Sequence, residues 1–211
     1  MGTTTIDLEE AVHKLILHHR LPVTFYGAFP ANKLPSILLN DSSLPPLCLS
    51  TLNESKAACC ILNTDPSFRK GLHWVAVYRE PNCPLEFFDS FAFSPATYGF
   101  HFPASSISNQ ITLQASTSTY SGAYCIFFIY LRSVYTCAPI STSHALSSSE
   151  RFNQTCLKIF HLANLHQKRD KIVRDFYCSL SKPQLPSTLT IRALLNYSLS
   201  LHPCSSTFSY F

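Results

Sequence analysis

The segment that decides the fold is residues 114–131, QASTSTYSGAYCIFFIYL, in which small polar residues give way to an apolar run. Residues 123–131 carry no charge and are too few to span a bilayer, which takes about 20 residues. This pattern predicts a helix buried on all sides in a globular core. Ser121 would begin that helix, where free backbone N–H groups and the helix dipole favour negative charge. A plain N-cap role and a nucleophilic role are both open for this residue.

Length and composition bound the class of protein. The 211 residues suffice for a single domain with a sizeable core, and we treat 1–211 as one domain. Hydrophobic residues make up 46% and charged residues 13%, with a net charge of +4. The surface is therefore lightly charged and mildly basic. The polar N-terminal residues and the absence of a long apolar segment favour an intracellular protein that neither is secreted nor enters a membrane.

The cysteines favour free thiols. There are nine, an odd number, with no C-x-x-C pair, and several lie in apolar runs. We expect buried thiols in a reducing compartment, and neither a disulfide framework nor a zinc site. No metal is therefore predicted. The cysteines are Cys48, Cys59, Cys60, Cys83, Cys125, Cys137, Cys156, Cys178 and Cys204.

Local patterns predict the flanking elements. Residues 6–19 form an amphipathic helix, with Asp7 and Glu10 resembling a capping box. We expect a turn-rich segment at 25–35, a short strand at 57–62, a loop at 91–103 and a serine-rich linker at 141–149. Residues 150–211 form a C-terminal extension that is helical to about residue 180. One face of it is basic, which favours either a solvated surface or weak DNA contact through Lys168, Arg169, Lys171 and Arg174.

A β-hairpin gives the strongest strand signal. Residues 72–78 (LHWVAVY) and 85–88 (LEFF) are aromatic and β-branched, and P-N-C-P lies between them. Opposed residues in an antiparallel pair have numbers with a constant sum, here about 164 for a turn near Asn82. His73 then lies close to Asp89. The two side chains are predicted to meet at one end of the hairpin.

His73, Asp89 and Ser121 together supply a base, a carboxylate that orients it, and a nucleophile. Each has a plain explanation when taken alone: a core histidine, a strand-end cap and an N-cap. Their order in the chain and their predicted places favour catalysis. The base is on a strand, the carboxylate follows the next strand, and the nucleophile begins a buried helix.

These residues resemble the motifs of the adenovirus endopeptidase (adenain) family, which includes proteases of Maverick/Polinton elements and belongs with the SUMO/ubiquitin-like proteases in a papain-like clan. The resemblance covers residues 25–131. Its motifs are His73-Trp74, the segment FFDSFAFS at 87–94, Gln114 seven residues before Ser121, and Gly122, Tyr124 and Cys125 after it. Residues 25–35 also resemble a family segment, with Asn32 where an acidic residue is usual.

The resemblance implies an α+β, papain-like fold in which a central buried helix packs on a mostly antiparallel sheet. His73 would be the general base, Asp89 would orient it, residue 121 would attack, and Gln114 would donate to the oxyanion. Trp74 and Gly122 would line the substrate cleft. The implied substrates are viral or element-encoded precursor proteins, such as capsid proteins, cut after small residues during virion maturation. A monomer in the host nucleus or cytoplasm, or in the virion, is expected.

Ser121 departs from the family, which has its nucleophilic cysteine at this position, while Cys125 matches a second, non-catalytic cysteine. A thiol has a pKa of about 8.5, which a helix N-terminus and a histidine can lower, whereas a serine hydroxyl needs a general base during attack. We therefore expect impaired activity. An engineered replacement, a decayed or repurposed copy, and a working serine enzyme are all open explanations.

Two other functions are open as well. A pseudoprotease would bind peptides without cutting them, and a deconjugating protease would act on SUMO-like or ubiquitin-like proteins. The adenovirus enzyme also uses a peptide cofactor that is disulfide-linked to a cysteine shortly before the glutamine. Residues 105–113 contain no cysteine, so we expect no such cofactor here.

Overall fold

The predicted hairpin forms the centre of the sheet. In the computed structural model, which describes residues 4–34, 56–69, 71–136 and 147–180, β3 (Trp74–Arg79) pairs antiparallel with β4 (Glu86–Phe88). Ala76 lies opposite Phe88 and Val77 opposite Phe87, so the pairs have the sum that the sequence predicts. The hairpin prediction is therefore confirmed in its register.

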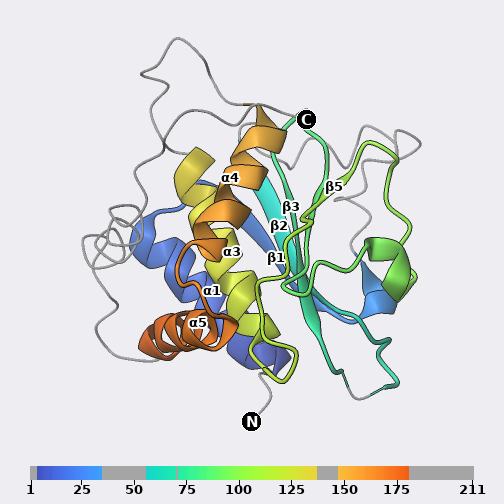
Figure 1. The fold of residues 1–211 in the computed structure, drawn as a ribbon. Coiled ribbons are helices and arrows are strands. Elements are labelled where there is room, and N and C mark those ends of the chain that lie inside the picture. The colour runs from blue at the N-terminus through green and yellow to red at the C-terminus, as the bar shows by residue number, and fades with distance from the viewer. Residues whose placement is uncertain (1–3, 35–55, 70, 137–146, 181–211) are drawn as a thin grey trace, which may run out of the picture.

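Three further strands complete a five-stranded sheet in the order β1-β2-β3-β4-β5 (Figure 1). β2 (Ala57–Asn63), predicted from the sequence, pairs antiparallel with β3. β1 (Val23–Phe29) runs parallel to β2, and β5 (Ile107–Ser108) runs parallel to β4. The sheet is therefore mixed, and the expected antiparallel arrangement holds for its two inner pairings only. The prediction of a turn-rich segment at 25–35 is wrong for residues 25–29, which belong to β1.

β1 carries a bulge at Gly27. The pairing with β2 shifts register between Phe25 and Ala28, and Gly27 has a φ of +121°. A Cβ at this position would lie 3.0 Å from Glu9 Oε1, which accepts a hydrogen bond from Ala28 N at 2.9 Å. Glycine is needed here because L side chains rarely adopt this backbone conformation.

Helix α3 (Ser121–Thr136) lies at the centre of the molecule, and the predicted central buried helix is confirmed. Residues 121–133 are all buried. Figure 1 shows α1, α3, α4 and α5 gathered on one side of the sheet. Phe128 of α3 stacks on Phe88 of β4 with ring centroids 4.3 Å apart, so the helix packs directly on the hairpin.

Two of the helices around α3, α1 and α4, begin after capping residues. α1 (Thr5–His19) is capped by Thr4, which exchanges hydrogen bonds with Asp7. The predicted capping pair was wrong in register, because Asp7 occupies the third helical position. α4 (Ser148–Phe160) is capped by Ser147 together with Glu150, so the last three residues of the predicted linker supply the cap and the first two residues of this helix instead. α5 (His166–Leu180) follows.

The loops contain short helical turns, η1 (Ala31–Lys33) and η3 (Pro95–Tyr98), the latter within the loop predicted at 91–103. The rest of the linker, Cys48, Cys137, Cys204 and the tail from residue 181 lie outside the described residues. The six described cysteines are free thiols. In the described part of the chain, no helix has the length and apolar character needed to cross a membrane.

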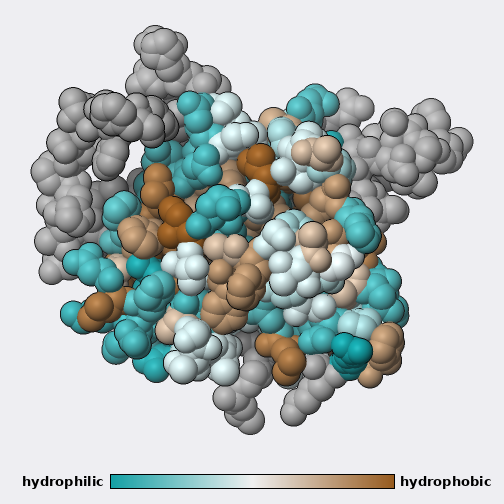
Figure 2. Space-filling view, turned by 45° about the vertical axis from the view of Figure 1, so that its right-hand side comes forward, coloured by the Kyte–Doolittle hydropathy of each residue, from teal (hydrophilic) through white to brown (hydrophobic). Residues whose placement is uncertain are grey.

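A buried ionic cluster joins α3 and α4 to β4. Arg132 donates to both carboxylate oxygens of Glu86, at 2.9 and 2.7 Å, and contacts Glu80 at 2.7 Å. Ser148 Oγ donates to Glu86 at 2.7 Å, and Arg151 also binds Glu80. Burial raises the pKa of Glu86, while hydrogen bonds from Arg132 and Ser148 oppose the rise. On the face drawn in Figure 2, hydrophilic and hydrophobic side chains are interspersed.

Candidate active site

The structure brings His73 and Asp89 together at one end of the hairpin. His73 immediately precedes β3, and Asp89 immediately follows β4. Nε2 of His73 lies 2.7 Å from Oδ1 of Asp89, and the two residues are 8% and 0% exposed. The hairpin register predicts this contact. The start of β3 and the end of β4 lie side by side at the open end of the antiparallel hairpin, and His73 and Asp89 are the next residues beyond them.

The Asp89 carboxylate is held by three other donors. Oδ1 accepts from Phe91 N at 2.9 Å, and Oδ2 accepts from Phe93 N at 3.1 Å and from the Tyr98 hydroxyl at 2.8 Å. Burial and the hydrogen bond to Asp89 raise the pKa of Tyr98, so its phenol stays protonated and donates. The carboxylate is thereby fixed in the orientation that meets His73.

Asn109 holds the backbone of Asp89. Its Oδ1 accepts from Asp89 N at 2.9 Å, and its Nδ2 donates to Asp89 O at 2.7 Å. Sequence reasoning missed Asn109 and Tyr98. A lone polar residue in a loop carries no local pattern, so only the fold shows that these two support the carboxylate.

Ser121 lies against the backbone that follows His73. It is the first residue of α3, it is 4% exposed, and its Oγ accepts from Trp74 N at 3.2 Å. The His73 ring stacks on Phe91 at 4.8 Å. Because Nε2 of His73 faces Asp89, Nδ1 is the nitrogen left to receive a proton from a nucleophile. No hydrogen bond joins Ser121 to His73 within the described structure.

Gln114 is buried and held from two sides. Its Oε1 accepts from Ser90 Oγ at 2.6 Å, and its Nε2 donates to Ser118 O at 2.8 Å. Because the Ser118 carbonyl oxygen can only accept, the Gln114 atom that faces it must be the amide nitrogen. Ser90 follows Asp89 and Ser118 shortly precedes Ser121, so Gln114 lies between the carboxylate and the head of α3. Neither serine was identified from the sequence.

Cys125, one turn after Ser121, is 1% exposed. Burial, with a further contribution from Asp89, raises its pKa well above the ordinary thiol value. A thiol in this environment stays protonated and lies inside the helix. This agrees with assigning the nucleophile position to residue 121.

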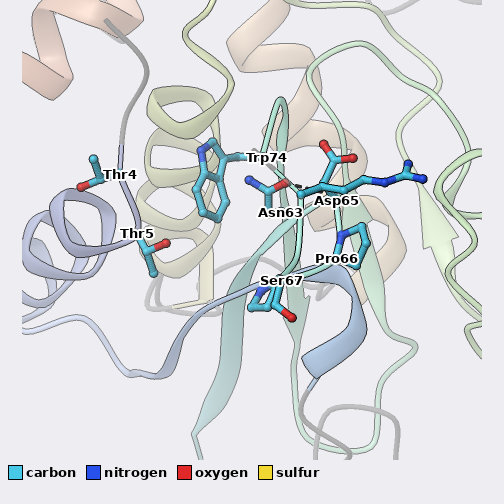
Figure 3. Close-up of a pocket in the computed structure, with 10 residues that line it drawn as sticks. Thr4, Thr5, Asn63, Asp65, Pro66, Ser67 and Trp74 are labelled. Atoms are coloured by element: carbon cyan, nitrogen blue, oxygen red, sulfur yellow. Dashed lines mark hydrogen bonds between the residues drawn. The ribbon is translucent and has the colours of Figure 1, made fainter.

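A pocket of about 380 Å³ opens beside Trp74 (Figure 3). Its walls come from the start of α1, the end of β2, residues 65–69, Gly71 and the Trp74 ring. Asn63 is 6% exposed; its Oδ1 accepts from Asp65 N at 2.9 Å, and its amide nitrogen points toward Trp74 in Figure 3. The lining residues are Thr4, Thr5, Pro30, Asn63, Asp65, Pro66, Ser67, Arg69, Gly71 and Trp74.

Two predicted cleft residues therefore differ in position. Trp74 lines the pocket, whereas Gly122 is buried in the first turn of α3 and is not part of the pocket wall. Asn32, at the position where the family has an acidic residue, exchanges hydrogen bonds with Ser67 of the wall at 3.0 and 3.2 Å. This contact holds the turn that closes the pocket.

The predicted basic face of α5 needs a correction. Arg169 is 1% exposed and donates to backbone carbonyls, so it is unavailable to a DNA partner. Lys168 is exposed, and Lys171 and Arg174 both pair with Asp175 at the surface. Arg169 is spaced with Val173, Phe176 and Leu180 along the buried side of the helix, which is the signal that the sequence reasoning overlooked.

Among the described residues, no group of three histidine, cysteine or acidic side chains is placed to hold a metal ion. A scan against protein-family models finds no match for this chain, and a search of curated proteins finds none either. The likeness to the adenain family therefore rests on the motif residues alone.

Proposed function

We propose that this chain has the scaffold of an adenain-like cysteine endopeptidase and that Ser121 at the nucleophile position impairs its activity. The observation that supports this most is the 2.7 Å contact between His73 and Asp89, with the Ser121 hydroxyl 3.2 Å from the backbone nitrogen of Trp74. Three separate elements thus supply a base, the carboxylate that orients it, and a nucleophile position at a helix N-terminus.

With a thiol at residue 121, His73 takes the thiol proton and the sulfur attacks the scissile carbonyl carbon. The carbonyl oxygen becomes an oxyanion, which the Gln114 amide and the N–H groups at the start of α3 stabilise. His73 then gives the proton to the leaving amine, and an acyl-enzyme forms. Water, deprotonated by His73, hydrolyses this thioester and regenerates the thiol. Asp89 stabilises the imidazolium in both halves of the cycle.

With serine the same steps are harder. The hydroxyl must lose its proton to His73 during attack, and this needs a short hydrogen bond between them. Ser121 instead accepts from Trp74 N and makes no hydrogen bond with His73 in the described structure. The arrangement therefore suits a larger, more acidic sulfur atom at this position.

The substrate would be a polypeptide, such as a viral or element-encoded precursor cut after small residues. The pocket beside Trp74 supports this, because Trp74 directly follows His73 in the chain and gives the pocket an indole wall beside polar groups that suit a peptide backbone. Asn63 supplies an amide nitrogen and Asp65 a carboxylate oxygen in the same wall. The resemblance to the adenain family is the reason to expect glycine or another small residue before the cut.

The test is hydrolysis of Gly-Gly and Gly-x-Gly peptides by the chain as given, by Ser121→Cys, and by Ser121→Cys with His73→Ala. We expect slow or no turnover by the first, turnover by the second, and its loss in the third. A folded Ser121→Cys protein that cuts no peptide would contradict the proposal.

A peptide-binding module is the second candidate, because Ser121 is bonded to the backbone and not to the base. It predicts that the chain as given binds the same peptides and that Ser121→Cys binds them equally well without turnover. Calorimetric titration of both proteins separates the two functions.

A further inference from the structure

Two neighbouring residues of α5 hold the backbone on both sides of Gln114. Arg169 Nη1 donates to the carbonyl oxygen of Leu113 at 2.7 Å, and Ala115 N donates to Asp170 Oδ1 at 3.4 Å. Arg169 is 1% exposed and Asp170 is 6% exposed. Two adjacent buried residues of opposite charge thus contact one short segment, and that segment carries Gln114, the proposed oxyanion donor.

The Arg169 guanidinium joins this segment to two other places. Nε and Nη2 donate to Phe160 O at the end of α4, at 3.1 and 2.8 Å, and Nη2 also donates to Ala163 O at 2.8 Å. The planar fork matches several carbonyl groups at fixed angles, which the point charge of a lysine does not. The segment before Gln114 is therefore tied to the connection between α4 and α5.

Asp170 joins the same segment to the nucleophile helix. The Tyr124 hydroxyl donates to Asp170 Oδ1 at 2.8 Å and lies 3.2 Å from Leu113 O. Burial and the hydrogen bond to Asp170 raise the pKa of Tyr124, so the phenol keeps the proton that it donates. Tyr124 is in the first turn of α3, which begins at Ser121. One carboxylate thus contacts both the Gln114 segment and α3.

We propose that Arg169 and Asp170 are positioning residues that fix Gln114 relative to the head of α3. This inference rests on the proposed function. An oxyanion donor is effective only at the place where charge develops, and a displacement of about 1 Å lowers the rate by about 100-fold. In the proposed mechanism Gln114 contacts the reacting oxygen, whereas Arg169 and Asp170 act through Gln114.

The experiment uses the full chain carrying Ser121→Cys, with Arg169→Lys as the test and Arg174→Lys as the matched control at the surface of the same helix. We expect Arg169→Lys to lower kcat for peptide hydrolysis by about 10- to 100-fold with KM within about 2-fold. Alkylation of the introduced thiol by iodoacetamide, followed at residue 121 by peptide mass spectrometry, should keep its rate, because that reaction forms no oxyanion. Arg174→Lys should leave both rates unchanged.

A double-mutant cycle distinguishes positioning from general weakening of the fold. In a Gln114→Ala background the effect of Arg169→Lys on kcat should disappear, because the donor that it places is gone. Asp170→Asn, which keeps the size of the side chain, should show the same dependence on Gln114. Thermal melting followed by circular dichroism shows whether each variant is folded. If Arg169→Lys does not fold, Asp170→Asn is used in its place.

The inference is overturned if Arg169→Lys or Asp170→Asn lowers hydrolysis and alkylation together, or if the loss of kcat persists without the Gln114 side chain. It is also overturned if Arg169→Lys and Asp170→Asn both leave kcat unchanged in a Ser121→Cys chain that hydrolyses peptides. A Ser121→Cys chain that is alkylated at residue 121 but hydrolyses no peptide contradicts the proposed function itself.

Discussion

At the scale of single residues, Asp89 is the most constrained group of the site. It accepts from His73, Phe91 N, Phe93 N and the Tyr98 hydroxyl. Asp89→Asn places an amide among donors, so some of these bonds are lost. In the Ser121→Cys chain we expect kcat/KM to fall by about 10²- to 10⁴-fold and the free energy of unfolding to fall by about 1–3 kcal/mol. Peptide hydrolysis and urea unfolding measure the two effects.

The control for this variant is Asp175→Asn, which removes an exposed carboxylate paired with Lys171 and Arg174. It should leave kcat/KM unchanged and lower the free energy of unfolding only slightly, because surface ion pairs contribute about 1 kcal/mol or less. Equal losses for the two variants would contradict the role given to Asp89.

Gly71 carries a second prediction at this scale. A Cβ at this position would lie 2.0 Å from Asn63 Nδ2, so Gly71→Ala must turn the Asn63 amide away from the pocket wall. We expect KM for peptides to rise while kcat changes little, and stability to fall by about 1–3 kcal/mol. The stability loss should shrink in an Asn63→Ala background, which removes the clash. A loss of the same size in both backgrounds would show that the close approach is not its cause.

Single residues were predictable where geometry links them. The meeting of His73 and Asp89 follows from hairpin register alone, because two strands and a turn centre fix which residues face each other. Ser90, Ser118 and Asn109 had no such link. Each is an isolated polar residue in a loop, and its partner is set by the folded chain.

At the scale of elements, the end of α1 is sensitive to pH. His19 packs against Tyr130 of α3 with ring centroids 5.1 Å apart, and burial, helped by His18, lowers its pKa below the ordinary 6.5. The unfolded chain then binds a proton more readily than the folded one, so stability is full above the unfolded pKa and falls as pH drops through the folded value. The urea midpoint should fall between about pH 7.5 and about pH 5.5.

His19→Asn should remove part of this pH dependence, whereas His101→Asn, at an exposed histidine, should leave it intact. Urea unfolding at the two pH values, followed by far-UV circular dichroism, gives the comparison. An unchanged pH dependence in His19→Asn would show that the α1–α3 contact is not its source.

Elements with strong local patterns were predictable, and those without were not. The uncharged run at 123–131 and the aromatic strands around Asn82 each carry their own signal. β1 pairs with β2 in parallel, and the partner lies far along the chain, so no adjacent turn marks the pairing. The charge of Arg169 predicted an exposed side chain, whereas its spacing with Val173 and Phe176 places it on the buried side of α5.

At the scale of the whole molecule, the cluster around Arg132 links α3, α4 and β4 in the interior. Arg132→Met leaves Glu86 buried without its main partner, so we expect the free energy of unfolding to fall by about 3–5 kcal/mol. Lys171→Met, which breaks a surface pair, should cost about 1 kcal/mol or less. Adding Glu86→Gln to Arg132→Met should recover part of the loss, because the uncompensated charge is then absent.

Urea unfolding of these variants at neutral pH makes the measurement. A cost for Arg132→Met no larger than that for Lys171→Met would mean that the buried cluster contributes no more than a surface contact. The sequence placed Glu86 in a strand and Arg132 beside an apolar run, but their pairing depends on how α3 lies on the sheet.

The central claim is that His73 acts on whatever atom stands at residue 121. The most direct measurement is the pH dependence of iodoacetamide alkylation at residue 121 in Ser121→Cys, compared with Ser121→Cys carrying His73→Ala. We predict that the first protein reacts through a thiolate with a pKa well below the ordinary value of about 8.5 and that the His73→Ala change restores a value near it. Identical pH profiles in the two proteins would contradict the claim.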